Sequence, residues 1–320
     1  MDELTQRARS WRIGLIGYGE VGRIVAEDLR ALGLQHLQAW DSKLAGQAAL
    51  AQPLREHAGA HGVRLVVGAA ELARESDLVI SAVTASQAVA VAAECSPALR
   101  SGSWFVDFNS ASPGAKSQAA AAVEASGARY VEAAVMTSVP PYRSKVPMLL
   151  GGPHALDFAP AIQALGFAGA RFGDRRLGIV SATKMCRSVM IKGLEAMVIE
   201  SFSAARAYGV EDAVLASLAE TFPGIDWEKQ GAYFFQRVIE HGRRRSEEMR
   251  EVARTVDEAG LHPWSAAGTA ERHAWMADLA EQGVFGRRGA LGFARSTDWR
   301  VEADRLLQAA RQARDIADKD

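Results

Sequence analysis

The feature that most constrains the fold is a glycine-rich turn between an apolar run and an amphipathic segment. The apolar run, Ile13 to Ile16, leads directly into the hexapeptide Gly17-Tyr18-Gly19-Glu20-Val21-Gly22. The residues after this turn place their apolar side chains on one helical stripe, which ends at Gly33. A strand, a G-x-G-x-x-G turn and a helix in this order predict a dinucleotide-binding βαβ unit.

Each glycine of the turn has a separate physical role. The first permits a tight turn, the second lets a pyrophosphate approach the backbone, and the third lets the helix pack against the strand. The free amides at the start of the helix then hold the phosphates. We therefore predict that the cofactor binds Gly17, Tyr18, Gly19, Glu20, Val21 and Gly22.

An acidic residue follows the second predicted strand. That strand is Leu37 to Trp40, and Asp41 comes nineteen residues after Gly22, where a dinucleotide fold places the carboxylate that binds the ribose 2′-hydroxyl. A 2′-phosphate would be repelled by Asp41, which favours NAD, while the nearby Lys43 leaves NADP open. The alternative is a glycine-rich turn in another α/β protein, such as a methyltransferase, with Asp41 as an ordinary loop residue.

Predicted strands and helices alternate over the first 170 or so residues. Strands are predicted at 63–67, 77–84, 103–108, 129–136, 146–150 and 170–172, and helices at 70–75, 85–99, 115–125 and 154–165. This alternation predicts an α/β fold, a Rossmann-type doubly wound parallel sheet, over residues 11–177. Residues 1–10 are polar, and we expect a flexible N-terminus.

Polar side chains follow two of these strands. Ser81, Val83 and Thr84 end the strand 77–84, and Asn109 follows the strand 103–108. Open α/β sheets bind ligands at the carboxyl ends of their strands, so we expect all four to contact the cofactor, with Asn109 at its nicotinamide half. Helix capping is the alternative role for Thr84.

From residue 178 onward the pattern is helical throughout. A long helix over 181–208 joins the first domain to a second, all-helical one, residues 178–320. Its other helices are predicted at 212–221, 228–259, 265–281 and 299–318. The apolar face of 228–259, formed by Tyr233, Phe234, Val238 and Ile239, fits either a dimer interface or an internal core.

The bulk properties exclude several function classes. A net charge of −1 and an isoelectric point of about 6.7 argue against nucleic acid or membrane partners. The N-terminus lacks a signal-peptide core, and no apolar run is long enough for a membrane span, so we expect a cytoplasmic protein. Cys95 and Cys186 are expected to be reduced thiols. The seven histidines show no ligand spacing that we recognise, and we predict no metal.

Hydride transfer to or from an alcohol needs a proton donor or acceptor beside the nicotinamide. Lys184, early in the long helix, is the best candidate, with Ser188 and Lys192 on the same face at successive turns. The positive end of the helix and an oxidised nicotinamide would disfavour the ammonium form of Lys184 and so favour a neutral base. The alternative is that Lys184 and Lys192 are solvated surface residues.

Four stretches resemble the β-hydroxyacid dehydrogenase family, which includes 3-hydroxyisobutyrate and 6-phosphogluconate dehydrogenases. They are the segments 14–22, 107–113, 132–138 and 173–188, and they keep the order and spacing of the family. The resemblance implies a catalytic lysine at Lys184, a second catalytic residue at Ser188, and a substrate-binding loop at Met136, Thr137 and Ser138. It also implies that the helical domain, residues 178–320, binds substrate and forms a homodimer. The reaction that it implies is NAD(P)-dependent oxidation of a small hydroxy acid or related polar alcohol.

This chain departs from the family pattern at several positions. Ser188 stands where the family has asparagine, and the segment Met136 to Ser138 replaces Ser-Gly-Gly. The later Lys-Asp-Leu segment has no good match, and Arg243 to Arg245 could supply the lost positive charge or form a solvated face. These changes leave two alternatives, an imine reductase-like enzyme and a dinucleotide-binding protein without turnover. The presence of Lys184 argues against the first.

Overall fold

The computed structural model describes residues 3–290, 293–294 and 296–317 of the chain. It divides into two compact units, Met1–Cys186 and Arg187–Asp320, and the division falls inside helix α8 (Ile179–Tyr208). The predicted alternation of strands and helices in the first part, followed by helices alone in the second, is confirmed.

The first unit is built on one eight-stranded sheet with the order β3-β2-β1-β4-β5-β6-β7-β8. Its central strand β1 pairs in parallel with β2 on one side and β4 on the other. The strands are β1 (Ile13–Ile16), β2 (Leu37–Trp40), β3 (Arg64–Leu65), β4 (Leu78–Ser81), β5 (Trp104–Asp107), β6 (Arg129–Val135), β7 (Met148–Gly151) and β8 (Ala170–Asp174).

The predicted doubly wound parallel sheet is confirmed as a mostly parallel one, with a single antiparallel pairing near one edge. Strand β7 pairs with β6 in antiparallel register, and β8 pairs with β7 in parallel register. The connection from β6 to β7 contains only the short 3-10 helix η4 (Arg143–Lys145). A parallel pairing would need a longer crossover, usually through an α-helix, so the chain turns back instead.

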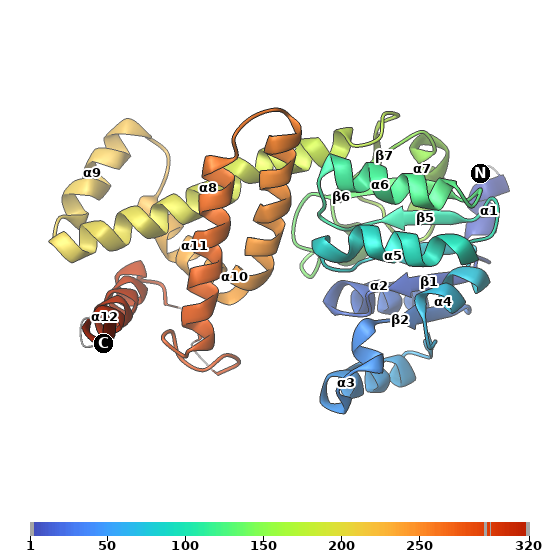
Figure 1. Cartoon of the computed structure of the whole chain (residues 1–320), viewed down its shortest axis with the longest axis horizontal. Coiled ribbons are helices and arrows are strands. Elements are labelled where there is room, and N and C mark those ends of the chain that lie inside the picture. The colour runs from blue at the N-terminus through green and yellow to red at the C-terminus, as the bar shows by residue number, and fades with distance from the viewer. Residues whose placement is uncertain (1–2, 291–292, 295, 318–320) are drawn as a thin grey trace. The chain divides into compact units, whose positions relative to one another are not determined.

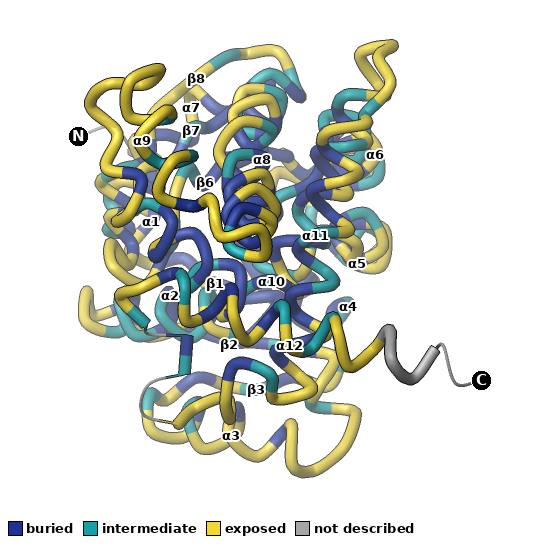
Figure 2. Tube along the Cα trace, turned by 90° about the vertical axis from the view of Figure 1, so that its left-hand side faces the viewer, coloured by how far each residue is buried: buried dark blue, intermediate teal, exposed yellow. Residues whose placement is uncertain are grey.

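Helices cover both faces of the sheet, as Figure 1 shows for the labelled elements. One apolar core lies under α1 (Glu3–Ala8), α2 (Glu20–Ala31), α3 (Ala48–Ala60) and α7 (Ala155–Ala164). The core on the other face lies under α4 (Ala69–Glu75), α5 (Ala88–Cys95) and α6 (Pro113–Glu124). Buried residues are concentrated in the strands and on the inner sides of these helices (Figure 2).

Besides η4, three further short 3-10 helices lie in this unit. They are η1 (Ser42–Ala45), η2 (Ala85–Gln87) and η3 (Ser96–Ala98). The single helix predicted over 85–99 is therefore divided into η2, α5 and η3, and Pro97 lies in the first turn of η3. Proline is readily accommodated there, because the first amides of a helix have no partner within it.

The prediction of a flexible N-terminus is wrong for the residues that the structure describes. Helix α1 packs on α7, with Ala8 fully buried and Leu4 against the same core. Trp11 is also buried, directly before β1. Gln6 and Arg7 lie on the exposed side of this short helix, whereas Thr5 is buried with Ala8. The mostly polar composition of the segment therefore concealed an amphipathic helix.

The second unit has its own aromatic core. Phe202 of α8 packs with Trp227, Phe235 and Trp299, which lie on the other helices of the unit. Those helices are α9 (Glu211–Thr221), α10 (Trp227–Glu258), α11 (Trp264–Glu281) and α12 (Trp299–Ala317).

The apolar face of α10 lies largely inside this core. Phe234, Val238 and Ile239 are buried in it, whereas Tyr233 remains 48% exposed. Of the two roles left open for this face, the structure supports the internal core.

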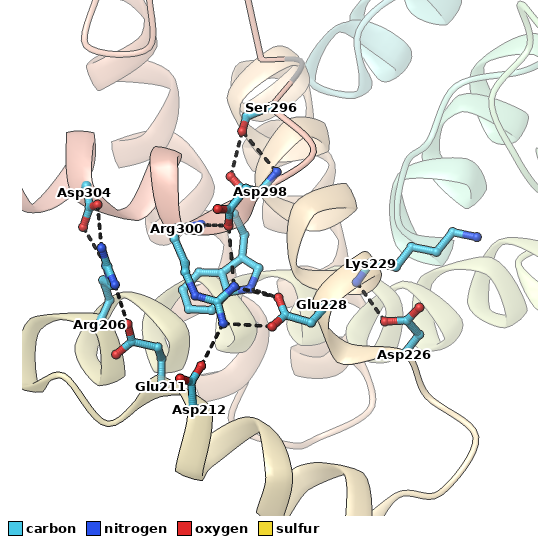
Figure 3. Close-up of polar contacts among 11 residues, drawn as sticks. Arg206, Glu211, Asp212, Asp226, Glu228, Lys229, Ser296, Asp298, Arg300 and Asp304 are labelled. Carbon is cyan, nitrogen blue, oxygen red and sulfur yellow. Dashed lines mark hydrogen bonds and ion pairs between the residues drawn. The ribbon is translucent and has the colours of Figure 1, made fainter.

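Two arginines join the polar ends of these helices. Arg300 of α12 bonds Glu228 of α10 at 2.8 Å and Asp212 of α9 at 3.0 Å (Figure 3). Arg206 of α8 binds Asp304 of α12 at 2.8 Å. Among the described residues, no helix has both the length and the apolarity that a membrane crossing needs.

Candidate functional site

The glycine turn has the geometry that its spacing predicts. Gly17 has φ of +87°, and a Cβ there would lie 2.3 Å from the carbonyl oxygen of Ala82. A Cβ on Gly22 would lie 2.2 Å from the carbonyl oxygen of Gly17. Only glycine fits at either position, so the turn is tight and α2 lies close against it.

Gly19 differs from both, because a Cβ there would meet no described atom within 4 Å. Gly19 is also the N-cap of α2, and no described side chain caps the amides that follow it. The first amides of an α-helix have no partner within the helix, and its N-terminus carries partial positive charge. The residues present therefore fit a pyrophosphate approaching Gly19, Glu20, Val21 and Gly22 through the backbone.

Tyr18 was predicted as a cofactor contact, and its side chain does not face this opening. The ring is fully buried, and its hydroxyl lies 2.9 Å from His57 Nδ1 on α3. Burial raises the pKa of Tyr18 to about 12. Any contact of Tyr18 with a dinucleotide is thus limited to its backbone.

Asp41 lies directly after β2, at the predicted end of the strand. Its Oδ1 accepts a hydrogen bond of 3.0 Å from the Lys43 amide and so caps η1. Only 8% of Asp41 is exposed. The carboxylate keeps its second oxygen for a further donor, which is compatible with a ribose hydroxyl.

Asn109 joins the ends of two neighbouring strands. Its Oδ1 accepts a 2.7 Å bond from the Val83 amide, and its Nδ2 donates a 3.0 Å bond to Ser81 Oγ. Asn109 and Ser81 are both buried, so their side chains hold the loops in place. Thr84 is exposed at the N-cap of η2 and makes no side-chain capping bond among the described residues.

A buried ion pair between Asp107 and Lys116 holds the start of the loop that contains Asn109. Asp107 Oδ1 lies 2.9 Å from Lys116 Nζ, with both side chains 1% exposed. The same carboxylate accepts bonds from the Asn109 amide at 2.8 Å and from the Tyr130 hydroxyl at 2.7 Å. Sequence reasoning assigned Asp107 no role, because an acid at a strand end gives no sign that its partner lies nine residues away.

The structure brings Lys184 to this loop. Lys184 Nζ donates a 2.5 Å hydrogen bond to Ser110 Oγ, and Ser110 directly follows Asn109. The side chain is partly buried rather than fully solvated. An amine and a hydroxyl therefore lie together at the carboxyl end of β5.

Glu132 on β6 fixes the helix that carries Lys184. It is completely buried, and its two oxygens accept bonds from the Gly178 amide at 2.7 Å and from Ser181 Oγ at 2.5 Å. Burial raises the pKa of Glu132, while the hydrogen bonds act against that effect. This anchoring role was missed from the sequence, because Glu132 and Ser181 are 49 residues apart.

Ser188 and Lys192 lie one and two turns beyond Lys184 on α8. Ser188 is buried, 6% exposed. Lys192 is also buried and pairs with Glu248 of α10 at 2.7 Å. The solvated-surface alternative is therefore wrong for Lys192, whose charge is neutralised within the second unit.

Met136, Thr137 and Ser138 directly follow β6, so they share the sheet edge at which β1, β4 and β5 end. The Met136 amide bonds to the carbonyl of Pro147 at 2.9 Å, which holds the start of this loop. Thr137 is exposed, and Met136 and Ser138 are half-buried. The predicted substrate loop thus lies at the same edge as the glycine turn.

The arginine run that could have supplied substrate charge is largely paired within the second unit. Arg243 bonds Asp278 and Glu281 of α11. Arg244 lies 3.5 Å from Glu248, and Arg245 is buried against Glu195 of α8.

Two families match this chain. Residues 12–170 match the NAD binding domain of 6-phosphogluconate dehydrogenase, and residues 205–276 match DUF1932, a domain of unknown function. The first match covers the strands and turns described above, and the second covers most of the helical unit.

Relatives extend the likeness to the whole chain. A conserved hypothetical protein from Sinorhizobium meliloti 1021 is 33% identical, with 96% of this chain and 99% of that one covered and a TM-score of 0.73. An uncharacterised 28.5 kDa protein from Methanothermus fervidus is 28% identical over 79% of this chain and 93% of its own length. The 3-hydroxyisobutyrate dehydrogenase of Mycobacterium tuberculosis is 18% identical, covers 89% of this chain and 97% of its own, and shares the fold with a TM-score of 0.66.

Proposed function

The chain belongs to the family that joins a 6-phosphogluconate dehydrogenase-type NAD-binding domain to a DUF1932 domain, and we propose that it is an NAD(P)-dependent oxidoreductase. Its substrate is a small hydroxy acid or a related polar alcohol. Lys184 is the general acid and base of the reaction.

The observation that carries this proposal is the contact between Lys184 Nζ and Ser110 Oγ, 2.5 Å apart. Ser110 belongs to the loop that Asn109 ties to the end of β4, on the sheet edge where an open α/β fold binds its ligand. A bound nicotinamide supplies the hydride acceptor or donor for such a reaction. The amine of Lys184 then takes the proton of the substrate hydroxyl, or returns it in the reverse direction.

Ser110 prepares Lys184 for this role. Its hydroxyl oxygen accepts a hydrogen bond from Lys184 Nζ and so fixes the direction in which the amine points. Ser188, one turn further along α8, is the second catalytic residue of the proposal. Thr137 and Ser138 supply donors for the acid group of the substrate at the end of β6.

Replacing Lys184 with alanine tests the proposal. Turnover of the best substrate in a panel of small hydroxy acids should fall by about 100- to 10,000-fold, the usual scale of general acid–base loss. Binding of the dinucleotide, followed by quenching of tryptophan fluorescence, should stay unchanged. Lys229→Ala is the matched control, since Lys229 is an exposed lysine of the second unit.

Unchanged turnover in the Lys184 variant would remove this residue from the mechanism. Reduction of cyclic imines without activity on any hydroxy acid would favour the imine reductase alternative. Tight dinucleotide binding without turnover of either class would favour a non-catalytic role.

The cofactor preference is part of the same proposal. Asp41 favours NAD, because its carboxylate would repel a 2′-phosphate and can accept a bond from a 2′-hydroxyl. Titration with NADH and NADPH in parallel tests this preference. A tighter complex with NADPH would contradict the role of Asp41.

We also propose a homodimer, placed in the cytoplasm. Met190 and Met197 of α8 and Trp264 of α11 are 70%, 60% and 80% exposed. They line a groove of about 790 Å³ between these two helices of the second unit. Met197→Glu should give monomers in light scattering if a second copy covers this groove.

A further inference from the structure

Three metal-ligating side chains converge in the first unit, and none of them is assigned above to the dinucleotide or the substrate. They are Glu27 on α2, His57 on α3, and His61, the C-cap of α3. One ligand atom from each lies within 4.8 Å of the other two. The expectation that the histidines lack ligand spacing is wrong here, since His57 and His61 are four residues apart on one helical face.

The arrangement gives two imidazoles and one carboxylate, all of them half-buried. His57 and His61 have their ring centroids 4.4 Å apart. His57 Nε2 lies 2.9 Å from Glu27 Oε1, so a cation between them would replace a single shared proton. Imidazole nitrogen and carboxylate oxygen are ligands of zinc and related divalent transition metals.

His57 and Glu27 are each held in orientation by a hydrogen bond with a neighbouring side chain, as metal ligands usually are. The Tyr18 hydroxyl lies 2.9 Å from His57 Nδ1, which leaves Nε2 as the nitrogen facing Glu27. Arg143 bonds Glu27 Oε2 at 2.7 Å and leaves Oε1 for the cluster. The charge of Arg143 is itself shared with Asp28, 2.7 Å away.

The backbone at His61 is fixed as well. Arg30 of α2 donates a 3.0 Å bond to the His61 carbonyl and binds the neighbouring Gly62 carbonyl. The end of α3 is thereby tied to the helix that carries Glu27. The distance between the ligands is therefore set by packing between α2 and α3 and not by one mobile loop.

We propose that Glu27, His57 and His61 form a binding site for a divalent transition metal ion, for which Zn²⁺ is the probe. The three protein ligands leave a fourth position for water. Tyr18 is the group that connects this site to the dinucleotide turn, because it lies between Gly17 and Gly19 and bonds His57.

This connection predicts linkage between the two sites. With metal on Nε2, the His57 ring would keep its proton on Nδ1, and this N–H would donate a hydrogen bond to the Tyr18 oxygen and hold Tyr18 in one orientation. A change in the turn on metal binding then changes dinucleotide affinity, and the dinucleotide changes metal affinity by the same factor. The linkage, but not the metal site, rests on the proposed function.

The experiment is a competition for Zn²⁺ between the full-length protein and a chromophoric chelator, without any dinucleotide. We expect one zinc per chain, with imidazole ligands in the X-ray absorption spectrum. His61→Ala and Glu27→Gln should each weaken zinc binding at least tenfold, and Tyr18→Phe by roughly 10- to 100-fold as the loss of an orienting partner.

His36→Ala is the matched control, because His36 is an exposed histidine outside the cluster and should leave zinc affinity unchanged. Circular dichroism of each variant separates ligand loss from unfolding. Failure of the wild type to bind zinc, or equal losses in His61→Ala and His36→Ala, would overturn the site.

Zinc binding that leaves dinucleotide affinity unaltered would overturn the linkage alone. Zinc binding by a protein that binds no dinucleotide would instead overturn the proposed function and leave the metal site standing.

Discussion

Ser181 Oγ donates a 2.5 Å hydrogen bond to Glu132 Oε2, and this contact fixes the first turn of α8 to strand β6. The second oxygen of Glu132 holds the amide of Gly178, just before the helix begins. Three residues after Ser181, the same helix presents Lys184. The position of the proposed base is therefore set by a buried acid on the central sheet.

Glu132→Ala should loosen this turn. It leaves the Gly178 amide and the Ser181 hydroxyl without their acceptor, at a cost of about 1–3 kcal/mol of unfolding free energy for each buried group left unpaired. Hydrogen exchange should accelerate at the amides of 178–184, and kcat should fall more than dinucleotide affinity. Ser181→Ala, which removes only one of the two bonds, is the milder control, and equal exchange in all three proteins would contradict the anchoring role.

The glycine turn permits a matched pair of substitutions. Gly19→Ala adds a methyl group where no described atom lies within 4 Å, so the melting temperature should hardly change while dinucleotide affinity falls. Gly22→Ala places its methyl 2.2 Å from the Gly17 carbonyl oxygen and should destabilise the fold. Thermal unfolding and fluorescence titration of both variants separate the two effects, and an unaltered affinity in Gly19→Ala would contradict backbone binding of the phosphates.

The buried pair of Asp107 and Lys116 predicts a large effect on stability. Lys116→Met leaves the Asp107 carboxylate buried without its cation, which typically costs about 3–5 kcal/mol. Asp107→Asn in the same background removes the charge and should restore part of the loss. Urea unfolding measures the unfolding free energy of Lys116→Met and of the double variant. If Lys116→Met were as stable as the wild type, the ion pair would contribute nothing to stability.

His273 of α11 predicts how stability depends on pH. Burial lowers the pKa of His273 to about 3, and neither ring nitrogen has a hydrogen-bond partner among the described residues. An unfolded histidine takes up its proton near pH 6.5, so stability is fully present above that pH and is lost as the pH falls towards 3. The loss should be on the order of 4–5 kcal/mol over this range.

His273→Phe should remove this dependence from the unfolding free energy measured between pH 7 and pH 4. His36→Asn, at an exposed histidine, should leave the dependence as it is in the wild type. An equally steep slope in His273→Phe would mean that other groups set the acid sensitivity.

The sequence was sufficient for the parts of the fold that local chemistry determines. The turn from Gly17 to Gly22, the strand ending at Trp40 and the long helix through Lys184 were all predicted close to their observed bounds. In each case a short stretch contains the whole signal, either as glycine spacing or as helical periodicity.

The features that could not be predicted from the sequence depend on contacts between residues far apart in the chain. The acceptor of Ser181 is 49 residues away, and the partner of Tyr18 is 39 residues away, so the side chains that fix the site carried no local sign of their role. The reversed strand β7 and the packing of α1 depend in the same way on tertiary contacts. The periodicity of α10 showed that Phe234 lies on an apolar face but not which surface covers that face.

Asp41 links the local stability of the loop after β2 to the choice of cofactor. Its carboxylate caps η1 through the Lys43 amide. Under the proposed function, the same carboxylate binds the ribose hydroxyl of the cofactor. Replacing Asp41 to accommodate the 2′-phosphate of NADP would also remove the hydrogen bond that caps η1. Under the proposed function, selection on cofactor choice therefore acts on a residue that also holds the turn between Ser42 and Ala45.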